Sequence, residues 1–142
     1  MLGTRKVDIV ANEVHPGALD LLEDSLYKAG FSHFVKVHQG DCQDFILLPS
    51  NRSGNVLVVT NPPWGVRLTE DMHDSWEALR VFLRENCPPG RTTAWILSGN
   101  KSATKHLGLR RSQSLSLKTG QQDLRWIQYE ILEKRPKQQH EQ

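Results

Sequence analysis

The sequence predicts an α/β fold, in which a mainly parallel sheet with crossover helices ends in an antiparallel hairpin. Strand-like and helix-like segments alternate along most of the 142 residues, which is the pattern of βαβ units. The final part of the chain departs from this alternation and carries two strand-like segments around a glycine turn. The composition, 37% hydrophobic and 24% charged, is typical of one globular domain with its own core.

The first part of the chain predicts three strands and one helix. The strands cover residues 7–11, 34–38 and 56–60, and the helix follows the first of them. Pro16 suits a first helical turn, leucines then recur at spacings of three and four, and Gly30 is a natural stop. Pro62 and Pro63 end the third strand, because proline cannot donate to a sheet ladder.

The second part predicts a helix over residues 70–86, a strand over 92–97 and a short helix over 101–106. The terminal hairpin pairs residues 112–118 with 124–132 around Gly120. We therefore expect one domain over residues 1–132, followed by a polar tail over 133–142.

Composition excludes several classes of protein. With 18 basic and 16 acidic residues, the net charge of +2 does not by itself indicate nucleic-acid binding. No run approaches the roughly 20 apolar residues of a membrane span, and the histidines lack metal-ligand spacing, so we expect neither a membrane nor a metal partner. Cys42 and Cys87 are typical of reduced thiols, which favours a cytoplasmic protein by default and leaves the nucleolus or an organelle open.

Two acids follow the first two predicted strands, at the edge where α/β sheets bind ligands. The Glu13 carboxylate can accept hydrogen bonds from both ribose hydroxyls of a nucleoside cofactor, or it can be a helix N-terminal acid. The Asp41 carboxylate can accept from an adenine amino group, or it can be an ordinary turn residue after Gly40.

The strongest signal is Asn61-Pro62-Pro63-Trp64, directly after the third strand. The Asn61 side-chain oxygen and the Pro62 carbonyl can accept the two N–H bonds of an exocyclic amine, which holds the nitrogen lone pair toward an electrophile. The Trp64 ring offers a face on which a base can stack, worth roughly 1–3 kcal/mol. Such a reaction depends on positioning and electrostatic support more than on a strong general base. The alternative is a proline-rich loop beside a core tryptophan.

This motif resembles the signature of S-adenosylmethionine-dependent methyltransferases that modify amino nitrogens. Its continuation, Gly65-Val66-Arg67-Leu68, is similar to the Gly-Glu-Arg-Leu of the K/L-like large-subunit ribosomal RNA guanine-N2 methyltransferases. The resemblance covers about residues 7–132. It implies a Rossmann-like class I methyltransferase sheet, S-adenosylmethionine as cofactor, ribosomal RNA as partner, and a THUMP domain upstream or in a partner.

The resemblance also implies roles for individual residues. The expected groups are the catalytic residues Asn61, Pro62, Pro63 and Trp64, the cofactor-binding residues Glu13, Asp41 and Asn61, and the substrate-binding residues Trp64, Arg67 and Lys101. Basic residues also gather around Lys101, where they either contact RNA phosphates or form a solvated face; they are Lys105, Arg110 and Arg111.

The sequence departs from the family pattern at its start. The family's catalytic domain begins with a strand, a glycine-rich loop of Asp-Pro-x-Cys-Gly-Ser-Gly-Thr type and a helix, and nothing in this sequence matches them. In the family, that strand lies between the equivalents of strands 7–11 and 56–60. Val66 replaces the family's Glu, and Trp64 replaces its usual Tyr. We therefore expect a partial domain, with weak or no binding of S-adenosylmethionine by this chain alone.

Two other functions compete with transfer to guanine N2. An N6-adenine or protein-glutamine methyltransferase uses the same four-residue signature. Alternatively, the chain is a non-catalytic remnant or a binding subunit, because the glycine-rich cofactor loop is missing from the sequence.

Overall fold

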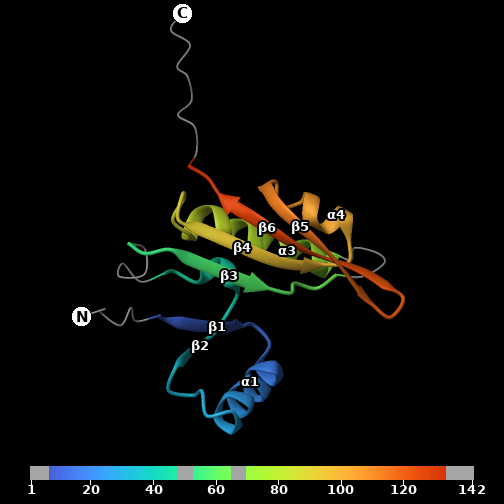
Figure 1. Cartoon of the computed structure of the whole chain (residues 1–142). Helices are drawn as coiled ribbons and strands as arrows, with labels where there is room; N and C mark the ends of the chain where they lie inside the picture. Colours follow the sequence, from blue (N-terminus) through green and yellow to red (C-terminus); the bar gives the residue numbers. More distant parts are fainter. Residues whose placement is uncertain (1–6, 48–52, 65–69, 134–142) are drawn as a thin grey trace, which may run out of the picture.

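The computed structural model describes residues 7–47, 53–64 and 70–133. Figure 1 shows the order of the elements along the chain. In that order, they are β1 (Ile9–Glu13), α1 (Pro16–Lys28), β2 (Val35–Gln39), the 3₁₀ turn η1 (Cys42–Asp44), β3 (Val56–Thr60), α3 (Glu70–Val81), the π-helical turn η2 (Phe82–Asn86), β4 (Thr92–Ser98), α4 (Lys101–Lys105), β5 (Arg110–Thr119) and β6 (Gln122–Ile131).

The strands form two separate sheets. In the first, β1 and β2 are parallel, with Ile9 opposite Val35 and Glu13 opposite Gln39. In the second, the order is β3-β4-β6-β5, where β3 and β4 are parallel and β6 is antiparallel to both of its neighbours. Within the described residues, β1 and β3 each have a neighbour on one side only. The sheet is therefore open at the place where the missing strand was expected.

The predicted terminal hairpin is present, and both of its strands begin two residues earlier than predicted. A two-residue connection joins β5 to β6, and Gly120 opens it with a φ of 61°, the positive value that a tight hairpin turn requires at this position. A register shift lies between Arg111 and Gln113, as in a β-bulge.

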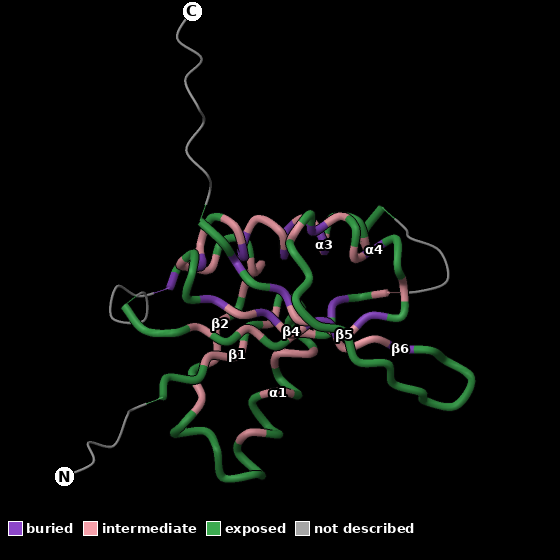
Figure 2. The backbone as a smooth tube through the Cα atoms, turned by 45° about the horizontal axis from the view of Figure 1, so that its top comes forward, coloured by how far each residue is buried: buried purple, intermediate pink, exposed green. Residues whose placement is uncertain are grey.

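The core lies between the four-stranded sheet and the helices α3 and α4, which lie on one face of it, the upper one in Figure 2. Burial alternates strictly along β4, so that Ala94 and Ile96 face the helices. Trp76, Ile96 and Ile127 are fully buried there, and each such side chain contributes about 1.5–3 kcal/mol or more through its burial.

The two-stranded unit is different, because none of the residues of β1, α1 and β2 is buried (Figure 2). It attaches to the main body through η1, which packs against α3 and η2. The rings of Phe45 and Phe82 lie 6.2 Å apart at this junction. The unit therefore depends on the main body for its packing.

Most predicted elements are present, and the differences in their bounds that bear on the site are the following. The strand expected at 7–11 runs from Ile9 to Glu13, so Glu13 is the last strand residue and does not follow the strand. The second strand shifts by one residue, to Val35–Gln39. The helix expected over 70–86 is α-helical only to Val81 and then widens into η2. Of the tail expected over 133–142, only Glu133 lies within the described residues.

No helix in the described part of the chain has both the length and the apolar character needed to cross a bilayer. Among the same residues, no group of three or more histidine, cysteine or acidic side chains is arranged to hold a metal ion.

Candidate active site

A cavity of about 1300 Å³ lies between the open edges of β1 and β3. Four of the predicted site residues line this cavity: Glu13, Asp41, Pro62 and Pro63. Asn61, Trp64 and Lys101 do not line it, and Arg67 lies outside the described residues.

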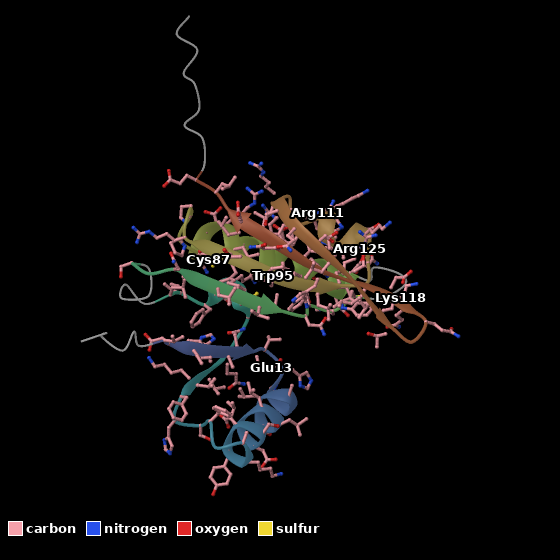
Figure 3. The ribbon with its side chains drawn as sticks, in the orientation of Figure 1. Glu13, Cys87, Trp95, Arg111, Lys118 and Arg125 are labelled. Atoms are coloured by element: carbon pink, nitrogen blue, oxygen red, sulfur yellow. The ribbon has the colours of Figure 1, made fainter. Side chains whose placement is uncertain are left out.

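Glu13 is the last residue of β1 and is half-buried, a few residues before the start of α1 (Figure 3). Its Oε1 accepts a hydrogen bond of 2.9 Å from the backbone N–H of His15, and His15 Nδ1 in turn accepts from Gly17 N–H and caps α1. Glu13 thus lies before the cap of α1, whose first turn contains no acidic residue. The bond to His15 leaves room for a ligand, because a carboxylate offers about four acceptor positions.

Asp41 is the N-cap of η1, where its Oδ1 accepts from the backbone N–H of Gln43 at 3.1 Å. The turn that carries Asp41 is tied to the end of β1 by two hydrogen bonds. Gly40 N–H donates to the Glu13 carbonyl at 3.0 Å, and Asn12 Nδ2 donates to the Gly40 carbonyl at 3.1 Å. These bonds hold both acids at one end of the two-stranded sheet.

Cys42 lines the cavity beside Asp41. Burial and the neighbouring Asp41 carboxylate raise the pKa of the Cys42 thiol from 9.0 to about 11. The group is therefore a neutral thiol near neutral pH, and a poor nucleophile.

The side chains of Asn61 and Trp64 contact each other across the two prolines. Trp64 Nε1 donates to Asn61 Oδ1 at 2.8 Å. The Trp64 ring lies against the backbone at Gly99, just after β4, where an added Cβ would stand 2.5 Å from Cζ3 of the ring. One side of the predicted stacking ring is thus packed on the protein, while the side chain as a whole is only half-buried.

Trp76 holds the second proline. It is fully buried on α3, and its Nε1 donates to the Pro63 carbonyl at 2.8 Å. This role was not predicted from the sequence. A buried indole N–H requires a hydrogen-bond acceptor. The acceptor here is a backbone carbonyl 13 residues away in the sequence, and no local pattern indicates it.

Asn86 is a second residue that the sequence analysis missed. It ends η2, and its Nδ2 donates to the carbonyls of Gln43 and Phe45 at 2.7 and 2.9 Å. These bonds fix the loop after Asp41 to the main body, which positions that acid relative to Pro62 and Pro63.

The predicted basic residues belong to α4 and β5, which follow the contact between Gly99 and Trp64 along the chain. Lys101 is exposed at the first position of α4, and Asn100 caps that helix by accepting from the N–H groups of Ser102 and Ala103 at 2.8 and 3.2 Å. Lys105 is exposed on α4, and Arg110 and Arg111 are exposed at the start of β5. Figure 3 places Arg111 near α4, with Arg125 and Lys118 further along the hairpin.

Comparison with known proteins places the chain among methyltransferases. A family model described as "RMKL-like, methyltransferase domain" matches residues 4–128. The "Ribosomal RNA large subunit methyltransferase K/L" of Syntrophotalea carbinolica is 28% identical over 109 residues, a stretch that covers 75% of this chain and 15% of that protein. The chain thus spans less than a sixth of the length of this relative.

Solved structures show the same fold. SMU.472 complexed with SAH matches 92% of this chain and 33% of its own, with a TM-score of 0.75 and 18% identity. An RNA methyltransferase from Salinibacter ruber in complex with S-adenosyl-L-homocysteine matches 93% of this chain and 71% of its own, with a TM-score of 0.53 and 16% identity. The predicted class I methyltransferase fold is therefore confirmed.

Proposed function

Because the chain belongs to the RMKL-like methyltransferase domain family, we propose that it takes part in methyl transfer from S-adenosylmethionine to an exocyclic amino nitrogen of RNA. The target we propose is guanine N2 of large-subunit ribosomal RNA. The observation that carries the proposal is the position of Asn61-Pro62-Pro63 directly after β3, with both prolines in the same cavity wall as Glu13 and Asp41.

The cavity fits the nucleoside half of the cofactor. Glu13 and Asp41 offer carboxylate oxygens to ribose hydroxyls and to an adenine amino group, and apolar side chains such as Leu79 and Phe82 line the same space. The described residues that line the cavity include no lysine, arginine or histidine, so the cofactor's own carboxylate finds no ionic partner among them. When bound, S-adenosylmethionine supplies a methyl group on a positively charged sulfur.

Asn61 and Pro62 position the accepting amine. The Asn61 amide oxygen accepts from Trp64 and retains a second lone pair for an amine N–H, while the Pro62 carbonyl accepts the other N–H. Two consecutive prolines fix φ, and the Trp76 bond to the Pro63 carbonyl holds the turn in place. The residues orient a neutral amine and need no strong general base.

The RNA would contact the protein through its target base at Asn61 and Trp64, and through its phosphates at Lys101. A paired guanine must leave the stack to bring its amino group to Asn61, which the half-buried Trp64 ring favours by stacking. Lys101 and the basic residues around it supply phosphate contacts at the margin of the site. The names of the K/L relatives support ribosomal RNA as the substrate.

The test uses the protein as its cells make it, purified through a tag placed after Gln142. The protein is incubated with methyl-tritiated S-adenosylmethionine and ribosomal RNA from cells in which the gene is deleted, and the RNA is digested to nucleosides. We expect label in N2-methylguanosine. Label only in N6-methyladenosine, or only in a glutamine of an added release-factor peptide, contradicts the guanine target, and no label at all favours the binding-subunit alternative.

Two variants complete the assay. Asn61→Ala removes an acceptor of the amine and is expected to lower the rate by about a hundredfold or more. Gln122→Ala is the control, since Gln122 is an exposed amide residue at the start of β6 that does not line the cavity, and this change is expected to leave the rate unchanged.

A further inference from the structure

A hydrogen-bonded pair of side chains, Asn12 and His38, lies near the end of the two-stranded sheet. The two residues are opposite each other in the register of β1 and β2, so their side chains leave the sheet on the same side. His38 Nδ1 lies 2.6 Å from Asn12 Oδ1, and Asn12 Nδ2 donates to the Gly40 carbonyl at 3.1 Å. The pair therefore connects the end of β1 to the turn that carries Asp41.

These contacts leave one assignment for the hydrogens of the pair. A carbonyl only accepts, so the Asn12 group that faces Gly40 is its NH₂ group, and the group that faces His38 is its oxygen. An amide oxygen also only accepts. The His38 Nδ1 must therefore carry a hydrogen and donate it, which makes the neutral ring the Nδ1–H tautomer.

The His38 ring is held by two further contacts. It packs edge-on against Phe45, with ring centroids 4.8 Å apart, and Phe45 packs in turn on Phe82 of the main body. Its Cε1 lies 3.1 Å from the place of an added Cβ at Gly40, which is closer than ordinary van der Waals contact. Gly40 also has a φ of 151°, a value that strains a residue with a Cβ. The ring and the glycine thus fit one another at this turn.

The pair acts on the turn that presents Asp41. The Gly40 N–H donates to the Glu13 carbonyl, and the Gly40 carbonyl accepts from Asn12, so the residue before Asp41 is fixed through both of its backbone polar groups. Asn12 and Asp41 are among the described residues that line the cavity, and His38 is not. His38 therefore reaches a molecule in the cavity only through the residues that it holds.

We propose that Asn12 and His38 are positioning residues that set the Asp41 carboxylate for the amino group of a bound adenine. The inference rests on the proposed function, in which Asp41 accepts from the adenine of the cofactor. A hydrogen bond weakens steeply when its acceptor is displaced or tilted. A looser turn therefore discriminates less between adenine, which carries this amino group, and hypoxanthine, which carries a carbonyl oxygen in its place.

The first measurement needs neither a ligand nor a variant. NMR of the ¹⁵N-labelled 142-residue chain at mildly alkaline pH distinguishes the two histidine tautomers by the chemical shifts of the ring nitrogens. We expect the hydrogen of the His38 ring on Nδ1. A hydrogen on Nε2 instead overturns the proposal, because Nδ1 then cannot donate to Asn12.

Two variants with side chains of the same branched shape isolate the N–H donor. His38→Asn keeps an N–H close to the place of Nδ1, and His38→Leu has a methyl group there. The readout is amide hydrogen exchange at Gln43, whose N–H donates to the Asp41 carboxylate. We expect this exchange to be about threefold to tenfold faster in His38→Leu than in the natural chain, and close to the natural rate in His38→Asn. Equal rates in the two variants overturn the proposal.

The second readout is the selection of the base. Adenosine and inosine differ at the position that Asp41 is proposed to contact, and NMR titrations give the dissociation constant of each. We expect the preference for adenosine to fall by about threefold to tenfold in His38→Leu and to be kept in His38→Asn. His33→Leu is the matched control, since His33 is an exposed histidine just before β2, and it is expected to leave the preference unchanged.

The inference and the proposed function fail in different ways. Equal or absent binding of the two nucleosides by the natural chain contradicts the adenine role of Asp41, on which the inference rests. A preference for adenosine that is the same in the natural chain and in His38→Leu contradicts the inference alone.

Discussion

The indole nitrogen of Trp64 donates a hydrogen bond of 2.8 Å to the side-chain oxygen of Asn61. The two outer residues of Asn61-Pro62-Pro63-Trp64 therefore hold each other across two prolines whose own φ angles are fixed. The consequence is a preformed acceptor, because the Asn61 amide is oriented before any base arrives. The Trp64 ring is oriented in turn by its contact with Gly99.

Gly99→Ala is expected to displace the Trp64 ring. The new Cβ would stand 2.5 and 2.6 Å from two ring carbons, a distance that forces the ring to move. We expect a loss of about 1–3 kcal/mol in the free energy of unfolding. Urea denaturation followed by circular dichroism measures this loss, which should largely disappear in a Trp64→Ala background because the two changes are coupled.

Gly54→Ala is the matched control for this substitution. Nothing lies within 4 Å of an added Cβ at Gly54, and its φ is not positive, so we expect stability to be unchanged or slightly increased. Equal losses for Gly99→Ala with and without Trp64 would show that the contact with the ring is not the cause.

Trp76→Phe is expected to loosen the proline turn. The variant keeps an aromatic ring in the core but loses the bond to the Pro63 carbonyl and leaves a small void. We expect a loss of about 1–3 kcal/mol in unfolding free energy, together with faster hydrogen exchange just after β3. Trp95→Phe is the control, since Trp95 is half-buried on the other face of the sheet beside Trp126, and this change should have the smaller effect.

Asn86→Ala is expected to free the loop that follows Asp41. The substitution removes both donors to the Gln43 and Phe45 carbonyls, which should cost about 1–3 kcal/mol. Hydrogen exchange should rise at Gln43 and Phe45 and stay unchanged in β4. If exchange in the loop is the same in both proteins, then η1 is held by its apolar packing and not by Asn86.

Stability should fall at high pH because of Cys42. Its folded-state pKa, about 11, lies above the ordinary value of 9.0, so the folded state binds the thiol proton more tightly than the unfolded state. The contribution is fully present below about pH 9 and is lost as the pH rises from about 9 to about 11. Denaturant titrations at several pH values should show a shallower slope in Cys42→Ser than in the natural chain. Some slope should remain, because burial also raises the pKa of the Tyr129 phenol.

Asp41→Asn separates the two causes of the Cys42 shift. Removing the carboxylate should lower the pKa of the thiol part of the way toward its ordinary value, while burial keeps it above that value. The ultraviolet absorbance of the thiolate follows the titration. An unchanged midpoint would assign the whole shift to burial.

The bounds of the elements were predicted most accurately where a local sequence pattern is compatible with one structure alone. The run from Val56 to Thr60 is β-branched or apolar and stops at two prolines, so both ends of β3 were predicted correctly. The end of β1 was misplaced, because its apolar run stops at Ala11 while backbone pairing with β2 continues to Glu13. The bonds from Trp76 to Pro63 and from Asn86 to Gln43 join distant residues, and no local pattern indicates them.

The opening between β1 and β3 separates the two halves of the candidate site. Glu13 and Asp41 belong to one sheet, and Asn61 and Pro62 follow a strand of the other. A ligand that contacts both groups therefore favours one particular spacing between the two sheets. Thermodynamic linkage makes this effect mutual: any change elsewhere in the protein that favours the same spacing strengthens ligand binding, and the bound ligand favours that change by the same factor.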